Sequence, residues 1–107
     1  LMKFDSEGEL QWSRQYGEEG QQDWCAGSAT DVNGNTFMLI ESPSTSGGQS
    51  SFTLVKYDAA GNLVAEKQLD STKSIFTGFT IDNNGGVYIT GADTESDWKI
   101  FLRKINF

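Results

Sequence analysis

The pattern Asp-x-x-Gly recurs four times and constrains the fold of this chain more than any other feature. It occupies residues 5–8, 31–34, 58–61 and 82–85, so successive aspartates are 24 to 27 residues apart. Asp side chains bond to their own backbone in turns, and Gly adopts positive φ without a steric cost. Short segments rich in apolar and aromatic residues flank each turn. The pattern therefore predicts evenly spaced β-hairpins in an all-β chain.

The segments between the turns are of strand length and lack a sustained helical period. Residues 10–16 alternate between apolar and polar side chains, which is typical of a half-buried strand. Residues 36–40 form a continuous apolar run, so we expect this strand in the centre of its sheet. Residues 42–51, with the only proline, Pro43, are expected to form the longest connection between strands. The expected strands are 1–4, 10–16, 24–30, 36–41, 52–57, 63–69, 76–81, 87–91 and 100–105.

A longer period of about 50 residues underlies the turns and marks four-stranded units. Leu1–Asp5 aligns with Leu54–Asp58 and with Leu102–Asn106, and Gly27–Asp31 aligns with Gly78–Asp82. Each unit has two Asp-x-x-Gly hairpins and hence four strands. Four-stranded units of this length are typical of β-propeller blades.

Residues 82–91 and 97–106 resemble the blade repeat of bacterial β-propellers from secreted and cell-surface proteins. In that family, an Asp-Gly turn leads into an aromatic strand ending in Thr-Gly, as at Thr90-Gly91. An Asp-led strand then ends in Lys-hydrophobic-Asp, similar to Lys104-Ile105-Asn106, and a second turn precedes a Trp-bearing strand, as in 5–12. The sequence departs from the pattern at Leu39-Ile40-Glu41, in place of Thr-Gly, and at Ala65, in place of Trp.

The resemblance covers nearly the whole chain and implies an incomplete propeller of about two repeats. It divides residues 1–107 into a partial blade at 1–16, a full blade at 24–69 and a partial blade at 75–105. Propellers close with four to eight blades. The expected partners are therefore the remaining blades of a larger propeller, or other copies of the chain through self-association. The expected location is secreted or on the cell surface.

Composition excludes several classes of function. Fifteen acidic and eight basic residues give a net charge of −7, which disfavours nucleic acid as a partner. With no His and one Cys, the chain lacks zinc ligands and the imidazole of Ser-His-Asp or Cys-His catalysis. No run approaches the ~18 apolar residues of a membrane span, so we expect no membrane insertion. The N-terminus lacks a signal-peptide plan, so any targeting segment is expected outside this sequence.

The blade order implied by the resemblance predicts a ligand-binding face. The four turns would share one face, and loops 17–23, 42–51, 70–74 and 93–97 would share the other. The loop face is acidic, with Asp70 among its acids and Lys73 its only base. Trp24 and Trp98, each after an aspartate, could present their rings to a sugar or peptide, or pack between blades. The candidate ligand-binding residues are Glu18, Glu19, Asp23, Trp24, Asp93, Glu95, Asp97 and Trp98.

Three other segments have competing interpretations. Asp31–Asn35 has oxygen side chains at alternate positions, like the start of a calcium loop, but lacks the later Gly and Glu and is better explained as a hairpin turn. Residues 31–37 also resemble the Asp-box turn of sialidases, which is mainly structural. Residues 5–12 are similar to the tryptophan-docking segment of quinoprotein-type propellers, which indicates packing. No cofactor is predicted, and Ca²⁺ stays open.

The leading hypothesis for function is a non-catalytic binding or scaffold module that engages protein or glycan through the acidic loop face. The alternative is part of a propeller enzyme of the hydrolase or lyase type, with carboxylates and a divalent cation at the channel mouth. Glu18 with Glu19, or Asp93 with Glu95, would be its candidate carboxylate pairs, because glycoside hydrolysis needs two carboxyl groups about 5 to 9 Å apart. The missing His favours the first hypothesis.

Overall fold

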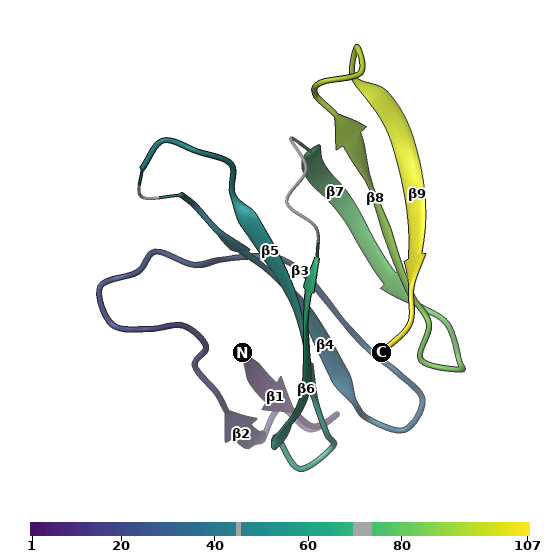
Figure 1. Ribbon diagram of the computed structural model, residues 1–107. Helices are drawn as coiled ribbons and strands as arrows, with labels where there is room; N and C mark the ends of the chain where they lie inside the picture. Colours follow the sequence, from purple (N-terminus) through teal and green to yellow (C-terminus); the bar gives the residue numbers. More distant parts are fainter. Residues whose placement is uncertain (45, 70–73) are drawn as a thin grey trace.

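Three antiparallel sheets make up the computed structural model, which describes residues 1–44, 46–69 and 74–107 (Figure 1). The described residues contain strands and turns but no helix, which confirms the all-β class. Accordingly, no helix in the described part of the chain could cross a membrane. Sheet A contains β1 (Met2–Phe4) and β2 (Leu10–Ser13); sheet B contains β3 (Trp24–Thr30), β4 (Thr36–Ser42), β5 (Ser51–Tyr57) and β6 (Leu63–Leu69); sheet C contains β7 (Ser74–Ile81), β8 (Val87–Asp93) and β9 (Lys99–Ile105).

Strands that are neighbours in sequence are also neighbours in each sheet. The orders are β1-β2, β3-β4-β5-β6 and β7-β8-β9. One predicted strand is too long: β2 ends at Ser13, whereas residues 10–16 were expected to be extended. Arg14 still exchanges two backbone hydrogen bonds with Leu1. Beyond Arg14 the chain leaves sheet A, and the Tyr16 side chain reaches Glu66 of sheet B. Residues 15 and 16 therefore belong to the connection that follows and not to a strand.

The four Asp-x-x-Gly segments form hairpin turns of one design. In each, Oδ1 of the aspartate accepts hydrogen bonds from the backbone N–H groups two and four residues later. The glycine N–H also donates to the aspartate carbonyl, and each glycine has positive φ. For Asp31 the two carboxylate bonds are both 2.9 Å, and Oδ2 accepts a third from the Asn35 side chain. The hairpin interpretation of Asp31–Asn35 is confirmed.

The sheets repeat the same strand register, which confirms the period of about 50 residues. In sheet B, Thr36 pairs with Tyr57, and in sheet C their aligned equivalents Val87 and Ile105 pair. A β-bulge follows Cys25 in β3 and recurs after its equivalent Phe76 in β7. The hairpins β1-β2 and β5-β6 match as well, because Lys3 pairs with Trp12 and Lys56 pairs with Ala65. The three sheets therefore share one plan.

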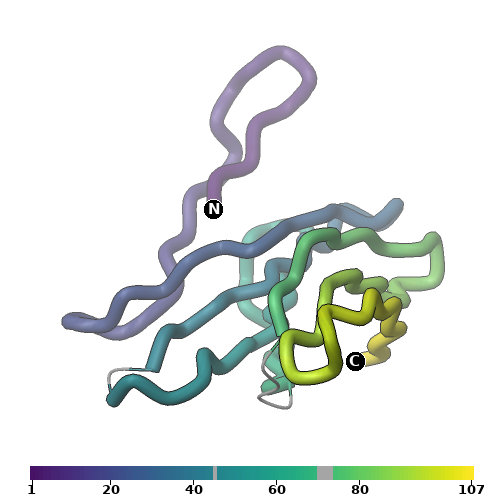
Figure 2. Tube along the Cα trace, turned by 90° about the horizontal axis from the view of Figure 1, so that it is seen from above, coloured from purple at the N-terminus to yellow at the C-terminus, as the bar shows by residue number. Residues whose placement is uncertain are grey.

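Sheet B lies between sheets A and C and forms the centre of two hydrophobic clusters. One of its faces contributes Phe37, Leu39, Phe52 and Leu54, which pack with Val87 and Ile89 of sheet C. The other contributes Met38, Ile40, Val55 and Tyr57, which pack with Trp12 of sheet A. Residues 36–40 are buried on both sides, which confirms the expected central place of this apolar run. Figure 2 shows the β1–β2 hairpin, in purple, projecting away from the rest.

Sheets B and C approach most closely at their first strands, β3 and β7. Gly27 lies in this contact, where a Cβ atom would be 2.7 Å from Cβ of Phe79. A side chain at position 27 would therefore push the sheets apart. No closed ring of sheets forms within the described residues.

Candidate ligand-binding groove

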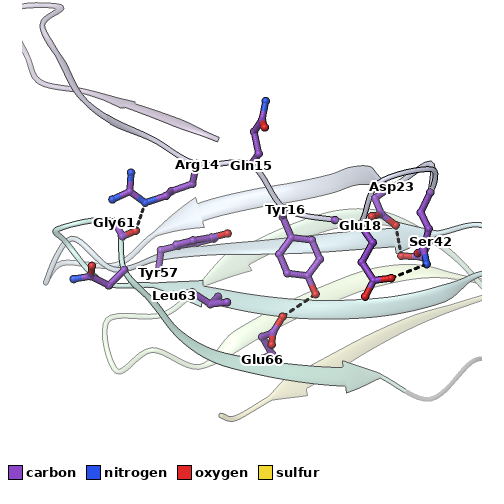
Figure 3. Close-up of a pocket in the computed structure, with 13 residues that line it drawn as sticks. Arg14, Gln15, Tyr16, Glu18, Asp23, Ser42, Tyr57, Gly61, Leu63 and Glu66 are labelled. Atoms are coloured by element: carbon purple, nitrogen blue, oxygen red, sulfur yellow. Dashed lines mark hydrogen bonds between the residues drawn. The ribbon is translucent and has the colours of Figure 1, made fainter.

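An open groove of about 680 Å³ runs between segment 14–23 and the A-facing side of sheet B. Segment 14–23 follows β2 and contributes one wall (Figure 3). β5 and β6 contribute the other wall through Tyr57, Leu63 and Glu66, and Ser42 at the end of β4 lies at the far end. The groove thus exists because the chain crosses from sheet A to sheet B at this point.

A tyrosine–carboxylate pair spans the groove. The Tyr16 hydroxyl donates a hydrogen bond of 2.8 Å to Oε1 of Glu66, and Figure 3 shows the two side chains pointing toward each other. Burial, and then the hydrogen bond and charge of Glu66, raise the pKa of Tyr16 to about 12. Tyr16 therefore stays protonated at neutral pH and acts as a hydrogen-bond donor.

Two more carboxylates line the groove and are held by neighbours. Asp23 accepts a hydrogen bond of 2.5 Å from the Ser42 hydroxyl, which joins segment 14–23 to the end of β4. Glu18 accepts a hydrogen bond of 3.3 Å from the Gln21 side chain. Ionised carboxylates are pure acceptors with about four lone-pair sites each, so these contacts leave capacity for a ligand.

Arg14 is the cation of the groove and joins it to the third hairpin turn. Its Nε donates to the carbonyl of Gly61, and its guanidinium lies 5.8 Å from the Trp12 ring centroid. Gly61 is required at this place for two reasons: its φ is +83°, and a Cβ atom would be 2.8 Å from the Trp12 ring. The turn glycine therefore also gives Trp12 room to pack on sheet B.

The groove is acidic, with aromatic walls. Three carboxylates, those of Glu18, Asp23 and Glu66, face one guanidinium, that of Arg14. The rings of Tyr16 and Tyr57 supply flat apolar surface, and burial raises the pKa of Tyr57 too. Such a site can bind neutral or cationic molecules rich in hydroxyl and amino groups, whereas it repels anions.

The structure brings four of the eight predicted site residues together, two of them in this groove and all four in a neighbouring depression. Glu18 and Asp23 line the groove. Together with Glu19 and Trp24 they also line a neighbouring depression of about 610 Å³ between segment 14–23 and the strands β3 and β4. Trp24 is 59% exposed, so it is not buried between the described sheets.

Of the other predicted residues, Asp93 ends β8, and Glu95, Asp97 and Trp98 lie on the connection to β9. None of the four lines either cavity. Asp93 accepts a hydrogen bond from the backbone N–H of Glu95. Asp97 and Trp98 have φ of 56° and 60°, and the Trp98 side chain is exposed. Asp70 and Lys73, also placed on the acidic face, lie outside the described residues.

Sequence reasoning missed Arg14, Tyr16, Ser42, Tyr57 and Glu66. Tyr16 and Glu66 were assigned only to strands, because each fits an extended segment. The proximity of Gly17 to Tyr16 indicates a chain direction change, but nothing in the sequence pairs Tyr16 with Glu66, 50 residues later.

Comparison of the chain with protein-family models, curated protein sequences and solved structures finds no match. Among the described residues, no group of three or more Cys, Asp or Glu side chains could hold a metal ion.

Proposed function

We propose that this chain is a non-catalytic binding module of propeller-type blades that binds glycans in the groove between sheets A and B. The observation that carries the proposal is the pairing of aromatic walls with fixed carboxylates, at Tyr16, Tyr57, Asp23 and Glu66. Sugars present both hydroxyl groups and apolar ring faces, so carboxylate acceptors and aromatic rings complement them.

The proposal includes a propeller architecture and a secreted or cell-surface location. The repeated register of sheets B and C and the stacking of three sheets on one plan support the architecture. The resemblance of 82–91 and 97–106 to bacterial propeller repeats supports the location. Further blades, or further copies of the chain, would be its structural partners.

Binding to a charged series of sugars tests the groove. We expect isothermal titration calorimetry to rank oligomers of glucosamine above neutral oligosaccharides, and these above oligomers of glucuronate, because the groove carries three carboxylates and one cation. The double variant Asp23→Asn/Glu66→Gln should weaken the cationic ligand by about tenfold or more, since hydrogen bonds to charged groups contribute about 1.5–3 kcal/mol.

A matched control and two further readouts decide the result. Glu7→Gln removes one exposed carboxylate from the turn at 5–8, outside the groove, and should leave affinity unchanged. Absence of sugar binding would contradict the groove assignment. NMR chemical-shift changes on addition of sugar that are confined to the backbone amides of residues 93–98 would contradict it as well. Shorter sugars detected by mass spectrometry after incubation would instead support the hydrolase alternative, and a rise in melting temperature with CaCl₂ would support a metal-dependent site.

A further inference from the structure

Four exposed apolar side chains occupy positions whose equivalents in sheet B are buried. The four are 54% to 81% exposed, whereas their equivalents are at most 3% exposed. The register assigns the equivalents without ambiguity, because the same cross-strand pairs recur in each sheet. Ile100 and Leu102 in β9 correspond to Phe52 and Leu54, and Met2 and Phe4 in β1 correspond to Val55 and Tyr57.

Each sheet has two faces that differ in role. We name the side of sheet B that carries Phe52 and Leu54 its front face, and the side that carries Val55 and Tyr57 its back face. The front of B packs on the back of C, at Val87 and Ile89. The front of A, at Leu1 and Trp12, packs on the back of B. Both contacts within the chain therefore join a front face to a back face.

One front face and one back face have no partner sheet among the described residues. The front of sheet C displays Ile100 and Leu102, and the back of sheet A displays Met2 and Phe4. The front of C also repeats a second feature of the covered front of B. Lys104 lies 5.1 Å from the Tyr88 ring centroid, as Lys56 lies 5.3 Å from that of Phe37. The exposed front thus keeps the chemistry of a face that is covered elsewhere in the molecule.

We propose that the front face of sheet C binds the back face of sheet A in a second copy of this chain. A second copy is the occupant because it carries a back face of the same plan, with apolar side chains at the required positions. The contact is heterologous, so copies associate head to tail and each dimer keeps one free face of each kind. The groove between sheets A and B lies within one copy and takes no part in this contact.

The interface between sheets A and B also predicts a polar contact in the dimer. Between sheets A and B, Lys3 Nζ donates to the carbonyl of Ala59 at 3.2 Å. Lys104 is the equivalent of Lys3, and Ser6 is the equivalent of Ala59. Lys104 of one copy should therefore donate to the carbonyl of Ser6 in the next.

Sedimentation velocity at rising concentration tests the association. The wild-type chain should shift from monomer to dimer and larger species below about 1 mM, the range of weak interfaces. Leu102→Asp and Met2→Asp each place a charge on one of the two faces and should weaken association at least tenfold. Both positions are exposed in the monomer, so circular dichroism should show unchanged folding. Val32→Asp, at an exposed apolar residue in a turn, is the matched control and should associate like wild type.

Mixing the two variants tests whether the copies associate head to tail. Leu102→Asp keeps an intact back face on sheet A, and Met2→Asp keeps an intact front face on sheet C. An equimolar mixture should therefore form dimers that stop at two copies, while each variant alone stays monomeric. The proposal is overturned if the wild type is monomeric at all concentrations, if either variant alone still forms dimers, or if Val32→Asp abolishes association.

Discussion

The carboxylate of Asp82 shows how one residue sets both the shape and the acid sensitivity of a hairpin. It accepts hydrogen bonds from the backbone N–H groups of Asn84 and Gly86, and Lys104 Nζ lies 3.1 Å from its Oδ2. The hydrogen bonds from Gly86 and Lys104 lower its pKa to about 2. Hydrogen bonds also lower the pKa of Asp31 and Asp58 in the equivalent turns, with Asn35 and Asn62 as the main donors.

We predict that these turns weaken as the pH falls from about 4 to about 2. Because the pKa of Asp82 in the folded chain is below its usual value of 3.8, its stabilising effect is complete above that value and is lost as the pH falls through about 2. Asp82→Asn should lower the melting temperature at pH 7 and make its further fall between pH 4 and pH 2 shallower than in wild type.

Asp97→Asn is the control for this experiment, since Asp97 lies outside the four turns. It should leave the acid dependence of the melting temperature unchanged. A wild-type melting temperature that is constant between pH 4 and pH 2 would contradict the prediction.

The central strands β4 and β5 carry the packing between sheets. Leu54 is completely buried and packs with Phe52, Val87 and Ile89 between sheets B and C. Leu54→Ala should lower the free energy of unfolding by about 2–5 kcal/mol, because the cavity it leaves cannot collapse fully between two sheets. Urea denaturation measures the change.

Leu63→Ala is the matched control, because Leu63 begins the outer strand β6 and is 47% exposed. It should cost less than about 1 kcal/mol, since little apolar area is removed from contact. Equal losses for the two variants would mean that the packing between sheets B and C does not stabilise the chain.

The elements themselves are largely predictable from local sequence. Turn positions follow from Asp and Gly, and strand positions follow from the apolar segments between them, as β3, β6 and the four turns illustrate. Three strands differ from their predicted bounds by more than one residue. β2 ends three residues early, β7 begins two residues early and β8 ends two residues late, because strand ends depend on pairing with neighbouring strands, which local propensity does not encode.

In the whole molecule, sheet A depends on few contacts for its position. Trp12 is its buried anchor: the indole N–H donates to the carbonyl of Ala59, and the ring lies 6.2 Å from that of Tyr57. Trp12→Ala should therefore release β1 and β2 while sheets B and C stay folded. Hydrogen exchange should show lost protection at amides in β1 and β2 and unchanged protection in β4, β5 and β8.

Trp98→Ala, at an exposed tryptophan between β8 and β9, should leave hydrogen exchange in sheet A unchanged. If Trp12→Ala instead lowers protection equally in all three sheets, the chain unfolds as one unit. The proposed independence of sheet A would then be wrong.

The sequence predicts less of the site than of the fold. Glu18, Asp23 and Trp24 lie in one neighbourhood because they are close in sequence. Their association with Glu66, Ser42 and Tyr57 depends on how the chain crosses from sheet A to sheet B. The grouping of Asp93, Glu95, Asp97 and Trp98 with them was based on face alone, and none of the four lines either cavity.

Local sequence is sufficient for the hairpins, the strand order and the repeat, because an Asp-x-x-Gly turn needs only the hydrogen bonds within its own five residues. Stacking of the sheets decides which equivalent positions are buried and where the groove forms. Leu54 and Leu102 stand at equivalent positions, yet one is buried and the other exposed, since only the first has a sheet against its front face. The groove arises in the same way, because Tyr16 and Glu66 meet only when sheet A packs on sheet B.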